Sequence, residues 1–294
     1  MKPLLFCLTV LVVISGACRC FALDWKTLHE QADTTDLRTA MQRVDHDPKS
    51  ADNLYVLGLV CLDLYQTRQA DQSFDRLIGL FPEIKEGLWG KAEVLRRYHR
   101  YAESEAILTR LIKEYPDYCP SYLTLAYIRF IQMRFGDSAD LAFKVMRRNK
   151  RDLDLVNYSR SHLLYAGAKG MLAHRGNPVS RIVNGVVVLP ALRKAQAMTP
   201  DRPEVLYGFG SYYLLAPRGL GKNIHLAKEY LERMVEADPQ FPDGFVRLAQ
   251  VYKITGDEKK YEKMLATALQ LDPQSELGLD VKNHTCRYIC PEKE

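Results

Sequence analysis

The sequence lacks the short motifs that mark the common enzyme classes. Its seven histidines show no HExxH spacing, and no GxSxG nucleophile turn occurs. The stretch that comes nearest to a phosphate-binding loop, around Gly221-Lys222, has Ala216 where a Walker A loop needs glycine and Asn223 where it needs serine or threonine. These absences favour a non-catalytic protein without a cofactor or a metal site.

An excess of charge of one sign is also missing. The chain has 41 Lys and Arg against 36 Asp and Glu, a net charge of +5, and without residues 1–22, which contain Lys2 and Arg19 and no acid, it would be +3. A dedicated nucleic-acid binder concentrates basic residues on one face to release phosphate counterions. The densest basic stretch, Arg147 to Arg151, falls at the end of a predicted helix, where cations favour the negative pole of the helix dipole. We expect no nucleic-acid partner.

Long apolar runs are missing except near the start of the chain. Lys2 precedes an apolar run from Leu4 to Val13, and Cys20-Phe21-Ala22 offers a small–x–small cleavage site. The run is short for a membrane span and is closed by Arg19. We predict a secretory signal peptide over residues 1–22, with an uncleaved anchor as the alternative, so the expected location is periplasmic or secreted. Any membrane anchoring is then expected only through the N-terminus.

A second interpretation concerns the same segment. Ser15-Gly16-Ala17-Cys18 is similar to a bacterial lipoprotein box, with two small residues before a cysteine. The similarity implies acylation of Cys18. Ser15 departs from the pattern, because a Leu or a similar residue is expected there.

Proline, by contrast, recurs at a fixed stride. Pro48, Pro82 and Pro116 are 34 residues apart, and Pro239 and Pro273 are again 34 apart. A period of this length is typical of stacked helix–turn–helix units, each of which buries its apolar face against its neighbours. Proline ends the second helix of a unit, because it has no N–H to donate and restricts the residue before it. The stride predicts an all-α helical-repeat solenoid.

Small and large apolar residues follow the same period. Small residues on the first helix of each unit, which let two helices approach closely, fall at Gly58, Ala92, Ala126, Gly210 and Ala249. Small residues on the second helix fall at Ala70, Ser104, Ser138 and Ala227, with Tyr261 as an exception. Large apolar residues four positions later, expected to fill the gap to the next unit, are Phe74, Leu108, Leu231 and Leu265.

These positions together resemble the tetratricopeptide repeat of bacterial secreted or periplasmic proteins, which implies a right-handed superhelical solenoid. Complete repeats are expected at 51–84, 85–118, 119–152, 203–241 and 242–275, a degenerate one at 153–202, a partial one at 23–50 and a cap or tail at 276–294. No Gly- and Ser-rich linker divides residues 51–275, so we expect one elongated domain. The repeat is a recognition scaffold that unrelated systems use, so it says little about function.

The middle of the chain departs most from the repeat. Extra residues lie between Ala166 and Pro190, and a second insertion lies around 216–223. We predict a helix from Pro178 to Met198, bent at Pro190, with its valine-rich stripe packed in the core; membrane contact is the alternative. If both insertions lie on one edge of the superhelix, they form a lip over the groove.

Four cysteines remain after residue 22. Cys61 and Cys119 fall on first helices and are expected to be small core residues. Cys286 and Cys290 lie in the tail, where a local disulfide is one prediction. A zinc site with His284 is the other, but it lacks a fourth ligand.

The resemblance assigns the inner wall. In tetratricopeptide arrays the fifth, ninth, twelfth and thirteenth residues of each repeat point into the concave surface. The predicted partner-binding residues are Tyr55, Leu59, Trp89, Arg96, Arg97, Leu123, Tyr127, Phe130, Tyr165, Tyr207 and Leu214. This wall is apolar and aromatic, and it lacks most of the basic residues that clamp an acidic chaperone tail.

Contiguous exposed apolar surface usually marks an interaction site. We predict a scaffold or adaptor of the cell envelope that binds an apolar peptide or helix, with Arg96 and Arg97 pairing with a carboxylate. Alternatively, superhelical closure or the middle segment covers the wall.

A second hypothesis is a carrier of an apolar small ligand, because the architecture is similar in outline to the T-component proteins of periplasmic TRAP-type transporters. An open groove favours the adaptor, and an enclosed tunnel lined by Tyr127, Phe130, Tyr165 and Tyr207 favours the carrier.

Overall fold

A computed structural model describes residues 23–148 and 153–291. Every regular element among these residues is helical, as the proline stride predicts. The predicted signal peptide over residues 1–22, and with it Cys18, lies outside the described residues. No helix within the described ranges combines the length and the apolar character needed to cross a membrane.

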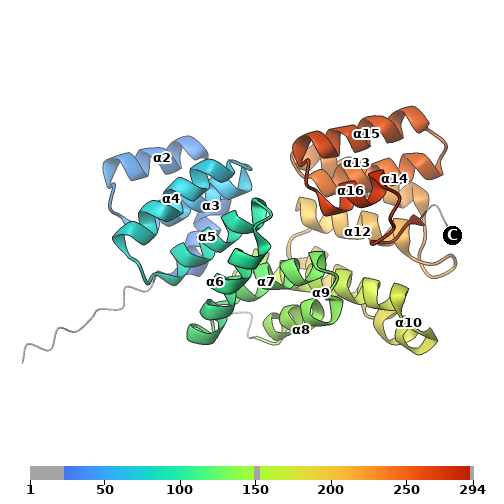
Figure 1. The fold of residues 1–294 in the computed structure, drawn as a ribbon, viewed down its shortest axis with the longest axis horizontal. Helices are drawn as coiled ribbons and strands as arrows, with labels where there is room; N and C mark the ends of the chain where they lie inside the picture. Colours follow the sequence, from blue (N-terminus) through green and yellow to red (C-terminus); the bar gives the residue numbers. More distant parts are fainter. Residues whose placement is uncertain (1–22, 149–152, 292–294) are drawn as a thin grey trace, which may run out of the picture.

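Most helices form antiparallel pairs that stack side by side. The pairs are α3 Ala51–Asp63 with α4 Thr67–Leu80, α5 Lys85–Arg97 with α6 Tyr101–Glu114, α7 Cys119–Ile131 with α8 Phe135–Met146, α9 Leu155–Arg175 with α11 Val188–Met198, α12 Pro203–Leu215 with α13 Ile224–Ala237, and α14 Pro242–Ile254 with α15 Glu258–Leu271. The remaining helices are α1 Trp25–Thr34, α2 Leu37–His46, α10 Pro178–Gly185 and α16 Glu276–Lys282. In Figure 1, α2–α6 and α12–α16 stand as two arms, joined below by α7–α10.

The packing between pairs depends on small residues in contact with large ones. The ring of Phe74 is fully buried, and it lies so close to α3 and α5 that a Cβ added at Gly58 or Gly90 would come within 2.5 Å of it. Leu231 lies equally close to Gly210, at 2.5 Å from a Cβ added there. This is the close helix approach that the small-residue positions predict, and it leaves no room for even a methyl group at these glycines.

Turns between paired helices repeat an unusual backbone conformation. Tyr65, His99 and Met133, which are 34 residues apart, have φ values of 56°, 57° and 59°. The corresponding turn between α14 and α15 uses Gly256, with φ 80°. Left-handed backbone is costly for residues with a Cβ and easy for glycine. The first three repeats therefore keep a side chain where glycine would be easier, and two of these side chains have partners across the molecule, described below.

The middle segment forms two helices where we predicted one. The break between α10 and α11 falls at Val186-Val187 and not at Pro190, so the predicted bend is wrong. Pro190 is the third residue of α11, and a proline is tolerated there because the first N–H groups of a helix have no partner within it. The predicted burial of the valine stripe is also wrong, since Val179, Ile182, Val183 and Val186 are exposed.

The tail folds back on the solenoid after α16. Cys286 and Cys290 are joined in a disulfide, so neither thiolate is available to a metal. Tyr288 is buried, and its hydroxyl donates to the carbonyl of Ile131 at the end of α7, at 3.0 Å. The carboxylate of Asp280 accepts from the backbone N–H groups of Arg287 and Tyr288, at 2.7 and 2.9 Å. The tail thus joins the C-terminal arm to the middle of the array.

Candidate binding chamber

A cavity of about 2270 Å³ occupies the concave side of the array. First helices of successive pairs supply its wall, and the turns of both arms supply its rim. We call this cavity the chamber. Eight of the predicted wall residues line it, namely Leu59, Trp89, Arg96, Arg97, Leu123, Tyr127, Phe130 and Tyr207.

Three predicted wall residues lie elsewhere. Leu214 is fully buried in the core with Leu231, and Tyr165 stacks on Phe143 of α8 with ring centroids 5.7 Å apart. Both follow the irregular middle of the chain, where a fixed 34-residue frame no longer gives the direction of a side chain. Tyr55 is on the correct face of α3 but is fully buried beneath another helix.

That helix is α1, which covers the concave wall of the first repeats. His29 lies between Tyr55 and Trp89, with ring centroids 5.7 and 5.5 Å away, and its Nε2 is 2.7 Å from the Tyr55 hydroxyl. Its Nδ1 is 3.1 Å from the amide of Asn157 on α9. Burial lowers the pKa of His29 to about 4, against an opposing effect of Asp154.

The covering by α1 answers one of the two questions left open by the sequence. The wall is partly covered by its own chain, but by the N-terminal helix and not by residues 166–190. We missed this helix, although its signal is present: Asp24 caps it, and Trp25, Leu28 and Ala32 recur at helical spacing.

Charged residues make the chamber more polar than the predicted wall. Arg96 donates to Glu93 at 2.7 Å and lies over the ring of Tyr127, 4.7 Å from its centroid. Burial opposes ionisation of Glu93, but the charge of Arg96 and its hydrogen bonds win and lower the pKa to about 2. Arg96 is therefore already paired within the protein, and the prediction that it meets a ligand carboxylate loses its support.

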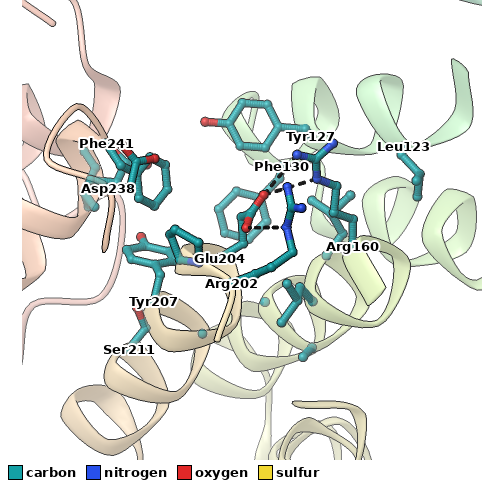
Figure 2. Close-up of a pocket in the computed structure, with 18 of the residues that line it drawn as sticks. Leu123, Tyr127, Phe130, Arg160, Arg202, Glu204, Tyr207, Ser211, Asp238 and Phe241 are labelled. Carbon is teal, nitrogen blue, oxygen red and sulfur yellow. Dashed lines mark hydrogen bonds and ion pairs between the residues drawn. The ribbon is translucent and has the colours of Figure 1, made fainter. Parts of the chain in front are cut away.

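A second ion pair lies deeper in the chamber. Figure 2 shows the carboxylate of Glu204 between the guanidinium groups of Arg160 and Arg202, at 3.0 and 3.5 Å. Burial alone would raise the pKa of Glu204, but these two charges lower it to about 2. Arg202 also pairs with Asp33 of α1, at 3.2 Å. The pairs lock charged residues of the middle segment in place.

Arg97 differs from these arginines. Its Nε and Nη1 are buried and have no hydrogen-bond partner within the described residues, and its guanidinium lies over the ring of Tyr65, 5.2 Å from the centroid. Burial, followed by the neighbouring charge of Arg96, lowers the pKa of Arg97. A buried cation without hydrogen-bond acceptors is costly. An anionic group of a ligand would satisfy it.

Aromatic side chains face one another across the chamber. Tyr127 and Phe130 extend from α7, and Tyr207 from α12 lies opposite, with Phe241 next to it (Figure 2). The rings of Tyr207 and Phe241 meet edge to face, with centroids 5.2 Å apart. The chamber therefore offers aromatic walls together with one unsatisfied cation.

Two contacts between the arms close one side of the chamber. The hydroxyl of Tyr65 donates to Asp238 at 2.8 Å. The ring nitrogens of His99 lie 3.1 Å from Asp272 and 3.2 Å from Glu276. Each contact starts from one of the left-handed turn residues of the N-terminal arm, and we call the two contacts the clasp. The side chain that replaces glycine at each turn is the one that reaches the opposite arm.

Comparison with known proteins supports the assignment of the fold. A family model described as tetratricopeptide repeat matches residues 242–275, which contain α14 and α15. A chain of the APC/C hetero-tetramer Cut9–Hcn1 has a TM-score of 0.62 at 12% identity over 88% of this chain and 49% of that one. The fold is that of a tetratricopeptide-repeat (TPR) array. No curated protein sequence matches the chain.

Two further structures have the same TPR architecture. A tetratricopeptide repeat protein from Parabacteroides merdae aligns with a TM-score of 0.53 at 13% identity, over 90% of this chain and 99% of that one. Human IFIT1, solved as a dimer with m7Gppp-AAAA, aligns with a TM-score of 0.57 at 19% identity, over 75% of this chain and 50% of that one. This chain spans about half the length of the Cut9–Hcn1 chain and of IFIT1. At these identities the likeness shows the fold alone.

The cysteines and candidate metal ligands of this TPR array are placed as follows. Cys61 and Cys119 are buried, as expected for small core residues. Among the residues that the structure describes, no group of three or more His, Cys, Asp and Glu side chains is arranged to hold a metal ion.

Proposed function

We propose that this TPR protein is a non-catalytic protein-binding scaffold, and that its chamber holds a peptide segment with apolar side chains and one carboxylate. The unsatisfied guanidinium of Arg97 carries this proposal, because it needs an anionic partner that the described residues do not supply. A carboxylate next to arginine forms strong charge-assisted hydrogen bonds. The aromatic residues Tyr127, Phe130 and Tyr207 would contact the apolar side chains.

The size of the chamber favours a peptide over a small molecule. Sites for small ligands usually measure about 300–1,000 Å³, and the chamber measures about 2270 Å³. Several residues of an extended or helical segment fit a cavity of this size. We place the protein in the cell envelope, periplasmic or secreted, on the signal-peptide pattern of residues 1–22, and acylation of Cys18 stays part of that proposal.

Photo-crosslinking tests the chamber directly. Benzoylphenylalanine in place of Tyr207, inside the chamber, should crosslink to a peptide segment of a partner protein in cells that produce the chain. The same group in place of Phe143, on the outer side against Tyr165, is the matched control. Equal crosslinking from both positions would contradict binding in the chamber.

Arg97 provides a sharper test once a peptide is identified. Arg97→Met keeps an apolar stem and removes the charge, so binding of the peptide should fall about 10- to 100-fold. A peptide whose carboxylate is replaced by an amide should bind both chains equally weakly. If the substitution weakens both peptides alike, Arg97 does not recognise a carboxylate.

A second candidate is a carrier of an apolar small ligand, of the kind implied by the outline of TRAP-type T-components. The observation in its favour is the clasp, which encloses the chamber beside Tyr127, Phe130 and Tyr207. Native mass spectrometry of the purified chain separates the two candidates. A bound lipid-like mass that is lost on Tyr207→Ser supports the carrier, and a bound peptide supports the scaffold.

A further inference from the structure

Helix α10 presents an unpartnered apolar face to solvent. Val179, Ile182, Val183 and Val186 recur at positions i, i+3, i+4 and i+7, and each is between 60% and 69% exposed. No residue of α10 is buried. The helix is nevertheless fixed to α9, because Lys169 donates to Asn184 at 3.0 Å and Ser180 donates to the Leu172 carbonyl at 3.2 Å. A fixed helix with one apolar face exposed is an interaction surface.

The second insertion lies on the same edge of the array. Residues 216–223 connect α12 to α13, and Leu220 at their tip is 72% exposed. The hydroxyl of Tyr212 donates to the Leu220 carbonyl at 2.9 Å, which holds the loop against α12. Leu220 and Val186 both line the chamber, and Figure 1 places α10 at the same end of the array as the loop after α12. We call α10 and residues 216–223 the lip.

The charge around the lip is of one sign. Residues 155–200 and 205–228 contain no Asp or Glu. Arg181, Arg193, Lys194 and Arg218 lie in these segments and are exposed. Among the described residues, no carboxylate forms an ion pair with any of these four side chains. The rest of the chain is nearly balanced, so the basic charge is concentrated where the apolar side chains are exposed.

We propose that the lip docks on the surface of an anionic lipid bilayer. A helix with an apolar face and basic neighbours lies in the interface between headgroups and acyl chains, where the apolar side chains leave water and the cations meet lipid phosphates. A second copy of the chain fits less well, because pairing two lips would bring Arg181, Arg193 and Arg218 of both copies together. Docking by the lip places the edge of the chamber at the membrane surface.

Tryptophan fluorescence in the full chain tests insertion of the lip. Val183→Trp should be quenched by brominated lipid in vesicles of phosphatidylcholine and phosphatidylglycerol. The control is Leu80→Trp, at an exposed position of α4 in the other arm. Because attachment through residues 1–22 would act on both variants equally, it cannot account for selective quenching at Val183. Equal quenching of the two variants, or none, would overturn the proposal.

Vesicle sedimentation tests the charge and the apolar face. Replacing Arg181 and Arg218 by Ser should weaken binding to phosphatidylglycerol vesicles about tenfold, as should Ile182→Ser with Val183→Ser, whereas Leu155→Ser, an equally exposed position on α9, should leave binding unchanged. Binding should fall with salt and be weak to pure phosphatidylcholine. If Val183→Trp fluorescence instead shifts with protein concentration in the absence of lipid, the lip is a dimer surface and the proposal is wrong. Arg97→Met should bind vesicles normally, so failure of the chamber proposal and failure of the lip proposal are distinguishable.

Discussion

The regular repeats of the N-terminal arm and the irregular middle of the chain treat their apolar surface in opposite ways. In α3–α7 the apolar residues are buried between helices, and α1 covers much of the concave wall. In α10 and the loop after α12, five large apolar residues remain exposed next to basic ones. Both regions are built from the same helix pairs. The difference shows that the insertions, and not the repeats, carry the surface that is left for partners outside the chamber.

Removal of a large side chain from the regular arm should have the largest effect. Phe74→Ala should lower the free energy of unfolding by about 3–5 kcal/mol, because the ring fills the gap between Gly58 and Gly90 and leaves a cavity. Urea denaturation followed by circular dichroism measures the loss. A loss below about 1 kcal/mol would show that the arm can collapse around the missing ring.

Acid should loosen the N-terminal arm through His29. Its folded pKa of about 4 lies below its ordinary value of 6.5, so the unfolded chain binds the proton first. The stabilisation is complete above about pH 6.5 and is lost as the pH falls towards 4, at a cost of about 2–3 kcal/mol. His29→Gln should lose less stability than the wild-type chain over this range. Parallel pH profiles for the two chains would contradict the role of His29.

The C-terminal arm should respond to pH with the opposite sign through Asp243. Burial, only partly offset by the charge of Arg247, raises its pKa to about 6, above its ordinary value of 3.8. The folded state therefore favours the protonated form, and this stabilisation is present below about pH 3.8 and lost as the pH rises through 6. Asp243→Asn should be more stable than the wild-type chain by about 1–2 kcal/mol at pH 8, and similar to it at pH 4. Denaturation at the two pH values measures the difference.

Substitution in the lip should have the smallest effect on stability. Val183→Ser should change the free energy of unfolding by less than about 0.5 kcal/mol, since an exposed side chain contributes little to folding. Thermal unfolding of this variant beside Phe74→Ala sharpens the comparison between the two regions. A large loss would mean that the valine face is buried in solution, contrary to the structure.

The sequence predicted the repeats well because their spacing is a local property. Gly58 and Phe74 fall at positions where a 34-residue period requires a small and a large residue, and the same frame places Arg97, Tyr127 and Phe130 in the chamber. It fails at Tyr165 and Leu214, which follow or lie within the irregular middle. Periodicity cannot tell where a terminal helix docks, so the burial of Tyr55 under α1 was out of reach. Ion pairs such as Arg96 with Glu93 depend on which charges tertiary packing brings together and which it leaves alone.

The clasp has a consequence for the rate at which cargo is exchanged. It joins residues that are 173 positions apart through a few side-chain hydrogen bonds, each worth about 1 kcal/mol. The repeats that carry these side chains are held by fully buried cores, so the arms can separate without unfolding any repeat. Entry and departure of a bound segment then follow the opening of Tyr65 from Asp238 and of His99 from Asp272. How long a segment stays inside can thus be adjusted at two surface turns, without changing the walls that select it.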